Sequence, residues 1–279
     1  MRSEHMEFMG KLKHIVSDQY HGKIINLMIS GSHLFGFESP DSDTDYRGCF
    51  QVVTDKLLTT RNVKDNIQYK IMKEGLTKDD IHDKDIFDKD AVLDELGKEV
   101  GLLLAGNCNH FEHLYAKQLL TSPEYIELRH IFKSQMNLSG IYHSYRGMAH
   151  QNYKKFILGG KHTVKKYLYV LRGLMAGTYV LETGEIEPNI TNLVKYFKLD
   201  GCSATVLELV GLKKRGMEKE RVNKNLDRYN RVTDEWFERI DKSAEDLPIL
   251  EWKETEERRD VLDEWLHKTR LGYLDGYKS

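Results

Sequence analysis

The chain has 279 residues, of which 40% are hydrophobic and 31% are charged, and its formal net charge is −2. This balance excludes an intrinsically disordered chain, because such chains combine few apolar residues with a large net charge. The small net charge also excludes a positive field over the whole molecule, so contact with nucleic acid would need a local basic patch.

Cysteine usage and hydropathy bear on the compartment. Cys49, Cys108 and Cys202 stand far apart and form no CxxC pair, which predicts neither a zinc ribbon nor a disulfide framework. The first ten residues lack the apolar segment of a signal peptide, and no stretch approaches the roughly 18 apolar residues of a membrane span. We therefore expect a cytoplasmic protein without membrane contact. The sequence carries no signal that favours one oligomeric state over another.

The N-terminal part mixes helix and strand patterns. Apolar residues at helical spacing predict helices, and short apolar or alternating runs predict strands. In chain order, these elements are a helix over residues 6–16, strands at 24–29, 45–53 and 67–71, an exposed charged excursion over 78–90, and a helix over 96–104.

The remainder of the chain predicts almost only helix. Thr121-Ser122-Pro123-Glu124 carries a capping hydroxyl, a first-turn proline and an early acid, which together start a helix. A long helix over residues 161–183 is expected to end at Gly184. The predicted fold class is therefore α+β, with a first domain of strands and helices over residues 1–118 and an all-helical domain over 119–279.

The segment from Ser30 to Gly48 carries the strongest chemical signal, because it links two predicted strands. Gly31 permits a tight turn and close approach of a phosphate, and Ser32 offers a hydroxyl where a short helix can begin. Asp43 and Asp45 stand two residues apart, so on an extended strand they point the same way. Such carboxylates repel each other unless a cation such as Mg²⁺ lies between them. The alternative is that these aspartates are turn formers.

This segment resembles a known family. Gly31-Ser32 followed about ten residues later by Asp-x-Asp is similar to the signature of DNA polymerase β-type nucleotidyltransferases. Phe35-Gly36 and residues 42–48 resemble a branch of predicted bacterial and phage nucleotidyltransferases, some of them linked with RNA repair. Residues 102–115 and 165–172 continue the resemblance, although Cys108 stands where that branch has proline. The match covers residues 24–190 in patches.

The resemblance implies a catalytic domain with a mixed sheet flanked by helices, and two Mg²⁺ ions, with Mn²⁺ as a substitute, held by three acids. Asp43 and Asp45 are two of them. In the resembled branch the third acid begins a short strand that leads into the helix before the asparagine turn. Counting back from that turn at residue 107 makes Asp90 the third acid, with Asp88 and Asp94 as competitors. The alternative for Asp90 is a place in a solvated acidic loop.

The resemblance also implies residues that bind the nucleotide, with residues 119–279 completing the site. Expected nucleotide contacts are Gly31, Ser32, Ser42, Lys165, Lys166, Tyr169 and Arg172. Lys165, Tyr169 and Arg172 lie at i, i+4 and i+7, so a helix presents them on one face. The expected function of this face is a cationic clamp on the triphosphate, and the alternative is a solvated helix edge. His110 and His113 could meet on a helix, but no zinc motif surrounds them, and Glu112 is expected to make an interdomain or capping contact.

The expected reaction is transfer of a nucleoside monophosphate from an NTP to an acceptor hydroxyl with release of pyrophosphate. The association with RNA repair favours an RNA end, such as that of a tRNA, as acceptor. Two alternatives stay open: nucleotidylylation (AMPylation) of a protein partner, and a non-catalytic NTP sensor. Retention of Asp43, Asp45 and the candidate third acid Asp90 argues against the sensor.

Overall fold

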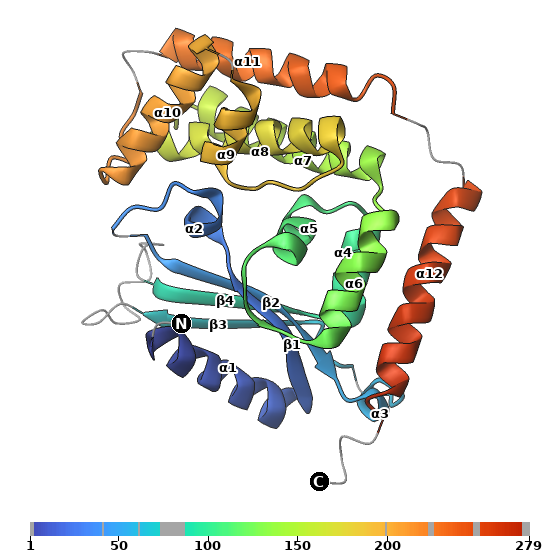
Figure 1. The fold of residues 1–279 in the computed structure, drawn as a ribbon. Coiled ribbons are helices and arrows are strands. Elements are labelled where there is room, and N and C mark those ends of the chain that lie inside the picture. The colour runs from blue at the N-terminus through green and yellow to red at the C-terminus, as the bar shows by residue number, and fades with distance from the viewer. Residues whose placement is uncertain are drawn as a thin grey trace.

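The protein is an α+β structure in which helices cover both faces of one sheet (Figure 1). The computed structural model describes residues 3–40, 42–60, 62–72, 87–198, 200–222, 226–247 and 252–274. Most of the charged excursion expected at 78–90 lies outside the described residues. The predicted fold class is confirmed, and none of the described helices combines the length and apolar character needed to cross a membrane.

Five strands form the sheet in the order β3-β4-β2-β1-β5. They are β1 (Gly22–Ile29), β2 (Thr44–Val52), β3 (Asn66–Met72), β4 (Phe87–Glu95) and β5 (Gln118–Thr121). β2 and β4 run parallel, and the other neighbouring pairs are antiparallel, so the sheet is mixed as expected. The three strands predicted from the sequence are confirmed. β4 was expected only through the family resemblance, as a short strand beginning at Asp90, and β5 was not predicted.

One face of the sheet is covered by α1 (Ser3–Tyr20). Its apolar stripe, at the predicted helical spacing, buries Phe8, Leu12 and Val16 against the sheet. Tyr46 and Phe50 of β2 meet this stripe, and the Phe8 and Tyr46 rings lie 4.4 Å apart. Since side chains alternate along a strand, Asp45, Arg47 and Cys49 project from the opposite face.

Four of the described helices lie near that opposite face: α2 (Gly31–Phe35), α4 (Leu96–Leu104), α5 (Cys108–Tyr115) and α6 (Pro123–Ser134). The short helix α3 (Thr54–Leu57) follows the end of β2. The helix start predicted at Ser122 is confirmed, because its hydroxyl accepts a hydrogen bond from the amide of Tyr125 at 3.3 Å. These helices share one large core with the helices that follow.

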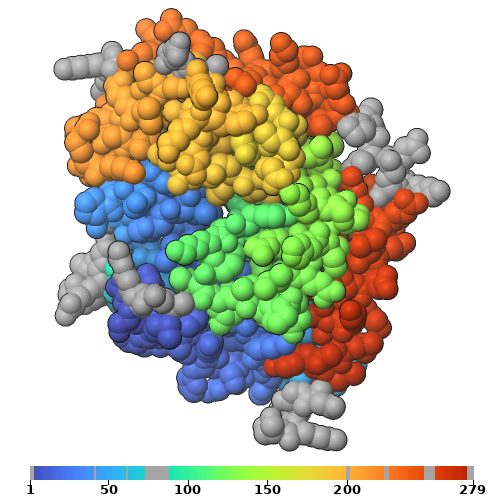
Figure 2. Space-filling model, in the orientation of Figure 1, coloured from blue at the N-terminus to red at the C-terminus, as the bar shows by residue number. Residues whose placement is uncertain are grey.

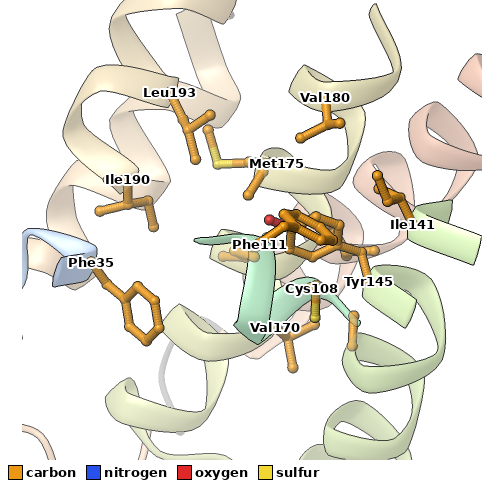
Figure 3. Close-up of a cluster of buried hydrophobic side chains, with 14 of the residues drawn as sticks. Phe35, Cys108, Phe111, Ile141, Tyr145, Val170, Met175, Val180, Ile190 and Leu193 are labelled. Atoms are coloured by element: carbon orange, nitrogen blue, oxygen red, sulfur yellow. The ribbon is translucent and has the colours of Figure 1, made fainter. Parts of the chain in front are cut away.

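The helices that follow pack around α8 (Val164–Thr183). They are α7 (Leu138–Asn152), the π-helical turn η3 (Tyr153–Leu158), α9 (Ile190–Phe197), α10 (Asp200–Lys214) and α11 (Leu226–Ser243). α8 ends as predicted at Gly184, which adopts the left-handed conformation with φ 70°. Figure 3 shows Val170, Met175 and Val180 among the side chains of this core, next to Phe111 of α5. The helical group is therefore continuous with the layer above the sheet.

The last helix, α12 (Trp252–Leu271), returns to the side of the sheet layer (Figure 1). The guanidinium of Arg270 donates to Glu95 Oε2 at 2.9 Å, and the carbonyl of Thr269 accepts from the Gln51 amide at 3.1 Å. β5 also begins at residue 118, where the boundary between the domains was placed. The division at 118 remains a prediction, and both features tie residues beyond it to the sheet.

Candidate active site

Two acidic side chains meet where β2 and β4 run side by side. Asp45 is the register partner of Asp90 in this parallel pair. The Arg47 guanidinium bridges them, with Nη2 3.1 Å from Asp45 Oδ1 and 3.7 Å from Asp90 Oδ2. Lys70 Nζ lies 3.8 Å from the same Asp90 oxygen. Two carboxylates are thus concentrated at one point and offset by cationic side chains.

The Gly31 turn closes directly onto this pair. Gly31 has φ 62°, and a Cβ atom there would lie only 2.1 Å from Asp45 Oδ2. The amide of Ser30 donates to the carbonyl of Asp45 at 2.7 Å, which fixes the end of β1 against the start of β2. α2 begins at Gly31, as the sequence predicted, and Ser32 in its first turn is buried. Glycine is required here by both conformation and space.

The other two residues of the motif lie just before β2. Asp43 is exposed and precedes the strand, which begins at Thr44, so only Asp45 of the two acids is on the strand. Ser42 holds the preceding turn, because its hydroxyl accepts from the amide of Ser39 at 2.9 Å and its own amide donates to the Ser39 carbonyl at 2.9 Å.

The electrostatics of these acids suit a cation. Burial raises the pKa of Asp45, the charge of Arg47 opposes that shift, and the charges of Asp43 and Asp90 add to it. Asp90 Oδ1 is buried without a hydrogen-bond partner. A buried carboxylate oxygen without a partner is costly, and a cation would satisfy it. The residues therefore fit a divalent ion with oxygen ligands.

The two other candidates for the third acid, Asp88 and Asp94, do not lie in register with Asp45. Asp88 is exposed. Asp94 is the register partner of Cys49, and its carboxylate contacts Lys98 Nζ at 2.8 Å and the Asn66 amide at 3.0 Å.

A cavity of about 340 Å³ opens beside Asp45. Gly31, Asp45 and Arg47 line one side, and α5 contributes His110 and His113. The Nε2 atom of His113 lies 3.2 Å from the hydroxyl of Ser30, the residue before the glycine turn. Burial holds the pKa of His113 well below its usual value. This ring is therefore neutral near pH 7.

Of the four predicted nucleotide contacts on α8, Tyr169 is the one that lines the cavity. Its ring packs edge-on against Phe35 and Phe37, with centroids 5.9 and 5.6 Å away. Lys165 is half-buried, and its Nζ lies 3.2 Å from Glu218 Oε1. Burial lowers the pKa of Lys165, but Glu218, Tyr169 and Asp43 raise it on balance. Lys166 Nζ lies 3.8 Å above the Phe156 ring.

Arg172, expected beside Lys165 in a cationic clamp or at a solvated helix edge, is instead buried. It is 1% exposed, donates to Glu112, and its guanidinium carbon lies 3.9 Å from the centroid of the Phe35 ring. The spacing failed because its partner, Glu112 on α5, is far away in sequence. Glu112 also accepts from the Tyr145 hydroxyl at 2.5 Å, so it joins α5 to α7 and α8. Arg172 is therefore engaged in the core, and we do not include it among the proposed nucleotide contacts.

Several cavity residues gave no usable signal in the sequence. Glu99 and Tyr125 line the cavity from α4 and α6, and the Tyr125 hydroxyl donates to Glu99 Oε1 at 3.1 Å. The spacing of His110 and His113 suggested a zinc pair, and that interpretation was rejected because no zinc motif surrounds them. Their rings lie 5.8 Å apart. Burial lowers the pKa of His110, but Glu99 and Asp94 raise it on balance.

The mixed sheet, the glycine turn and the acids beside it define a class, the DNA polymerase β-type nucleotidyltransferases. The chain belongs to the RlaP family, an RNA repair pathway DNA polymerase beta family, whose model matches residues 5–268. It is similar to the uncharacterized protein YcgL of Bacillus subtilis (strain 168), with 28% identity over 83% of this chain and 85% of that protein. It is also similar to the uncharacterized protein MJ0002 of Methanocaldococcus jannaschii, with 30% identity over 60% of this chain and 64% of that protein.

Proposed function

We propose that this chain transfers a nucleoside monophosphate from an NTP to the hydroxyl of an RNA end, such as that of a tRNA, and releases pyrophosphate. The observation that carries the proposal is the Asp45–Asp90 pair in register, closed off by the Gly31 turn. The family's description as part of an RNA repair pathway supports RNA as the acceptor.

Asp43, Asp45 and Asp90 are the residues that would hold two Mg²⁺ ions, or Mn²⁺ in their place. Their fit rests on the shared position of Asp45 and Asp90 and on the unpartnered Asp90 oxygen. When bound, such ions neutralise phosphate charge and make a hydroxyl more acidic. In this structure Arg47 offsets part of the same negative charge.

The proposed nucleotide contacts divide by chemistry. The backbone of Gly31 and the hydroxyl of Ser32 receive the β- and γ-phosphates, because only a glycine lets an anion approach so closely. Lys165 supplies a point charge to the triphosphate, and Lys166 is the alternative cation. Tyr169 stacks on the base, and Ser42 holds the turn before the acids.

The chemical step follows from these positions. The acceptor oxygen forms a bond to the α-phosphorus, and the bond from that phosphorus to the pyrophosphate oxygen breaks on the opposite side. The attacking and leaving oxygens are in line. Pyrophosphate leaves with the electron pair, and the hydroxyl proton passes to the Asp90 carboxylate. In this proposal residues 1–118 carry the catalytic acids, and residues 119–279 complete the NTP site and contribute to the acceptor site.

The test uses each NTP radiolabelled at its α-phosphate, which stays with the transferred nucleoside monophosphate. Transfer of this label to RNA ends or to protein acceptors is measured with Mg²⁺. Asp45→Asn and Asp90→Asn should reduce transfer at least about 100-fold, since each removes an acid from the ion site. Asp55→Asn and Asp88→Asn alter exposed aspartates and should keep it. Full transfer by Asp45→Asn would refute the assignment.

The acceptor is decided by where the label goes. Label on RNA supports the proposal, and label on protein only would replace it with protein nucleotidylylation. Magnesium-dependent NTP binding without product, with either acceptor, would identify a sensor and overturn the proposal.

A further inference from the structure

The far end of the active-site cavity holds a second group of cation-binding side chains. Asp94 comes from β4, Glu99 from α4 and His110 from α5. Their ligand atoms all lie within 4.8 Å of one another, and all three residues line the cavity. Their side chains are 13%, 4% and 12% exposed, so the group is shielded yet open to the cavity.

This group is separate from the paired acids described above. Asp94 follows Asp90 by four residues on the same strand, a separation of about 13 Å at the usual rise per residue. Two catalytic ions lie only about 4 Å apart. An ion held at Asp94 is therefore too distant to be shared with Asp45.

Contacts from outside the group hold the two carboxylates beside the His110 ring, Glu99 at Nδ1 and Asp94 at Nε2. Glu99 Oε2 lies 2.6 Å from His110 Nδ1, and the other oxygen of Glu99 accepts from the Tyr125 hydroxyl at 3.1 Å. Lys98 and Asn66 both bind Oδ1 of Asp94, so Oδ2 is left facing His110 Nε2 at 3.8 Å. Outer contacts of this kind fix ligand geometry in metal sites.

We propose that Asp94, Glu99 and His110 bind a divalent ion of borderline softness, such as Zn²⁺ or Fe²⁺, at the far end of the active-site cavity. One imidazole with two carboxylates suits such an ion better than Mg²⁺, which prefers oxygen ligands throughout. Three protein ligands leave a coordination position for water or a substrate oxygen from the cavity. The site is independent of the proposed nucleotidyl transfer.

Protons compete with the ion for the coordinating nitrogen of His110. The His110 ring has to be neutral to coordinate. An ion bound at Nδ1 replaces the hydrogen bond with Glu99, and an ion bound at Nε2 takes the place of a protonated ring nitrogen that faces Asp94. Affinity for the ion should therefore fall as the pH is lowered.

The test uses Co²⁺, whose visible absorption reports the number and type of its ligands. The full chain carrying Asp45→Asn and Asp90→Asn serves as background, so that the paired acids contribute nothing. We expect one equivalent of Co²⁺ to bind. Adding His110→Ala or Glu99→Gln should weaken binding at least tenfold. The matched control is His14→Ala, which removes an exposed His–Asp pair whose Nδ1 and Oδ2 atoms lie 3.0 Å apart.

Circular dichroism checks that each variant folds, and Glu99→Gln, being nearly isosteric, keeps the test available should His110→Ala unfold. No Co²⁺ binding by the background chain would overturn the proposal, as would binding unchanged by both substitutions. Neither result bears on NTP turnover, so this proposal and the proposed function fail separately.

Discussion

Replacing Gly31 by alanine tests whether the glycine turn positions Asp45, the proposed catalytic acid. The new Cβ atom would lie 2.1 Å from Asp45 Oδ2, 3.0 Å from its Cγ and 3.2 Å from its Cβ. Ordinary van der Waals contact begins at 3.4 Å. The carboxylate must therefore retreat by about 1.3 Å, the difference between 3.4 Å and 2.1 Å. Arg47, 3.1 Å from the other oxygen, resists this movement.

The expected effect is larger on activity than on stability. Misplacing a catalytic group by about 1 Å can reduce the rate about 100-fold. Alanine at φ 62° adds a backbone penalty of about 1–2 kcal/mol. For a chain of this size each kcal/mol lowers Tm by about 2–4 °C. We therefore expect about 100-fold slower NTP turnover with a modest fall in Tm.

Gly184→Ala separates the two effects. Gly184 has φ 70°, but a Cβ atom there would meet nothing within 4 Å. This variant therefore carries the same type of backbone penalty far from the acids. Turnover and thermal melting are measured for both variants. If Gly31→Ala turns over NTP within threefold of Gly184→Ala, about 0.7 kcal/mol in activation energy, the close approach does not position the carboxylate.

Three further predictions concern charge. Arg47→Gln removes the guanidinium that offsets the paired acids, so added Mg²⁺ should raise Tm more than in the unsubstituted chain; an equal rise would contradict this. Glu112→Gln leaves the buried Arg172 uncompensated and should lower the free energy of unfolding by about 3–5 kcal/mol in urea titrations, whereas a loss below about 1 kcal/mol would not fit. Because burial lowers the pKa of His113, the unfolded chain binds its proton first, so stability should fall as the pH drops below about 6.5. His113→Asn should lessen that fall and the exposed His33→Asn should not, as urea titrations at several pH values would show.

Much of the fold is predictable because its signals are local. Strand β1 is a short buried apolar run, and α8 ends at a glycine that takes the left-handed conformation. Strand β5 gave no such signal. Its four residues, Gln118–Thr121, are half-buried or exposed, and the antiparallel neighbour β1 supplies the pairing that makes them a strand. Local pattern cannot reveal a strand that a distant partner imposes.

The candidate site also combines residues with local sequence signals and residues placed by distant partners. Gly31 and Asp45 are recognisable because the turn and the strand that hold them are close in sequence. The position of Asp90 beside Asp45 depends on the parallel pairing of β2 with β4, which no local spacing encodes. Resemblance to a family supplied that residue instead. Glu99 and Tyr125 reach the cavity only through the packing of α4 and α6, so the sequence could not name them.

The contacts of Arg172 show how the helical part reaches the glycine turn. Its guanidinium lies over Phe35, the last residue of α2, and Gly31 is the first. Figure 2 shows the light-blue segment around α2 directly against the helices of the second half, and Tyr169 packs on the same phenylalanine. The ion pair with Glu112 holds that guanidinium in place. The buried pair therefore supports the turn that closes on the acids, and its loss should slow NTP turnover even at temperatures where the chain stays folded.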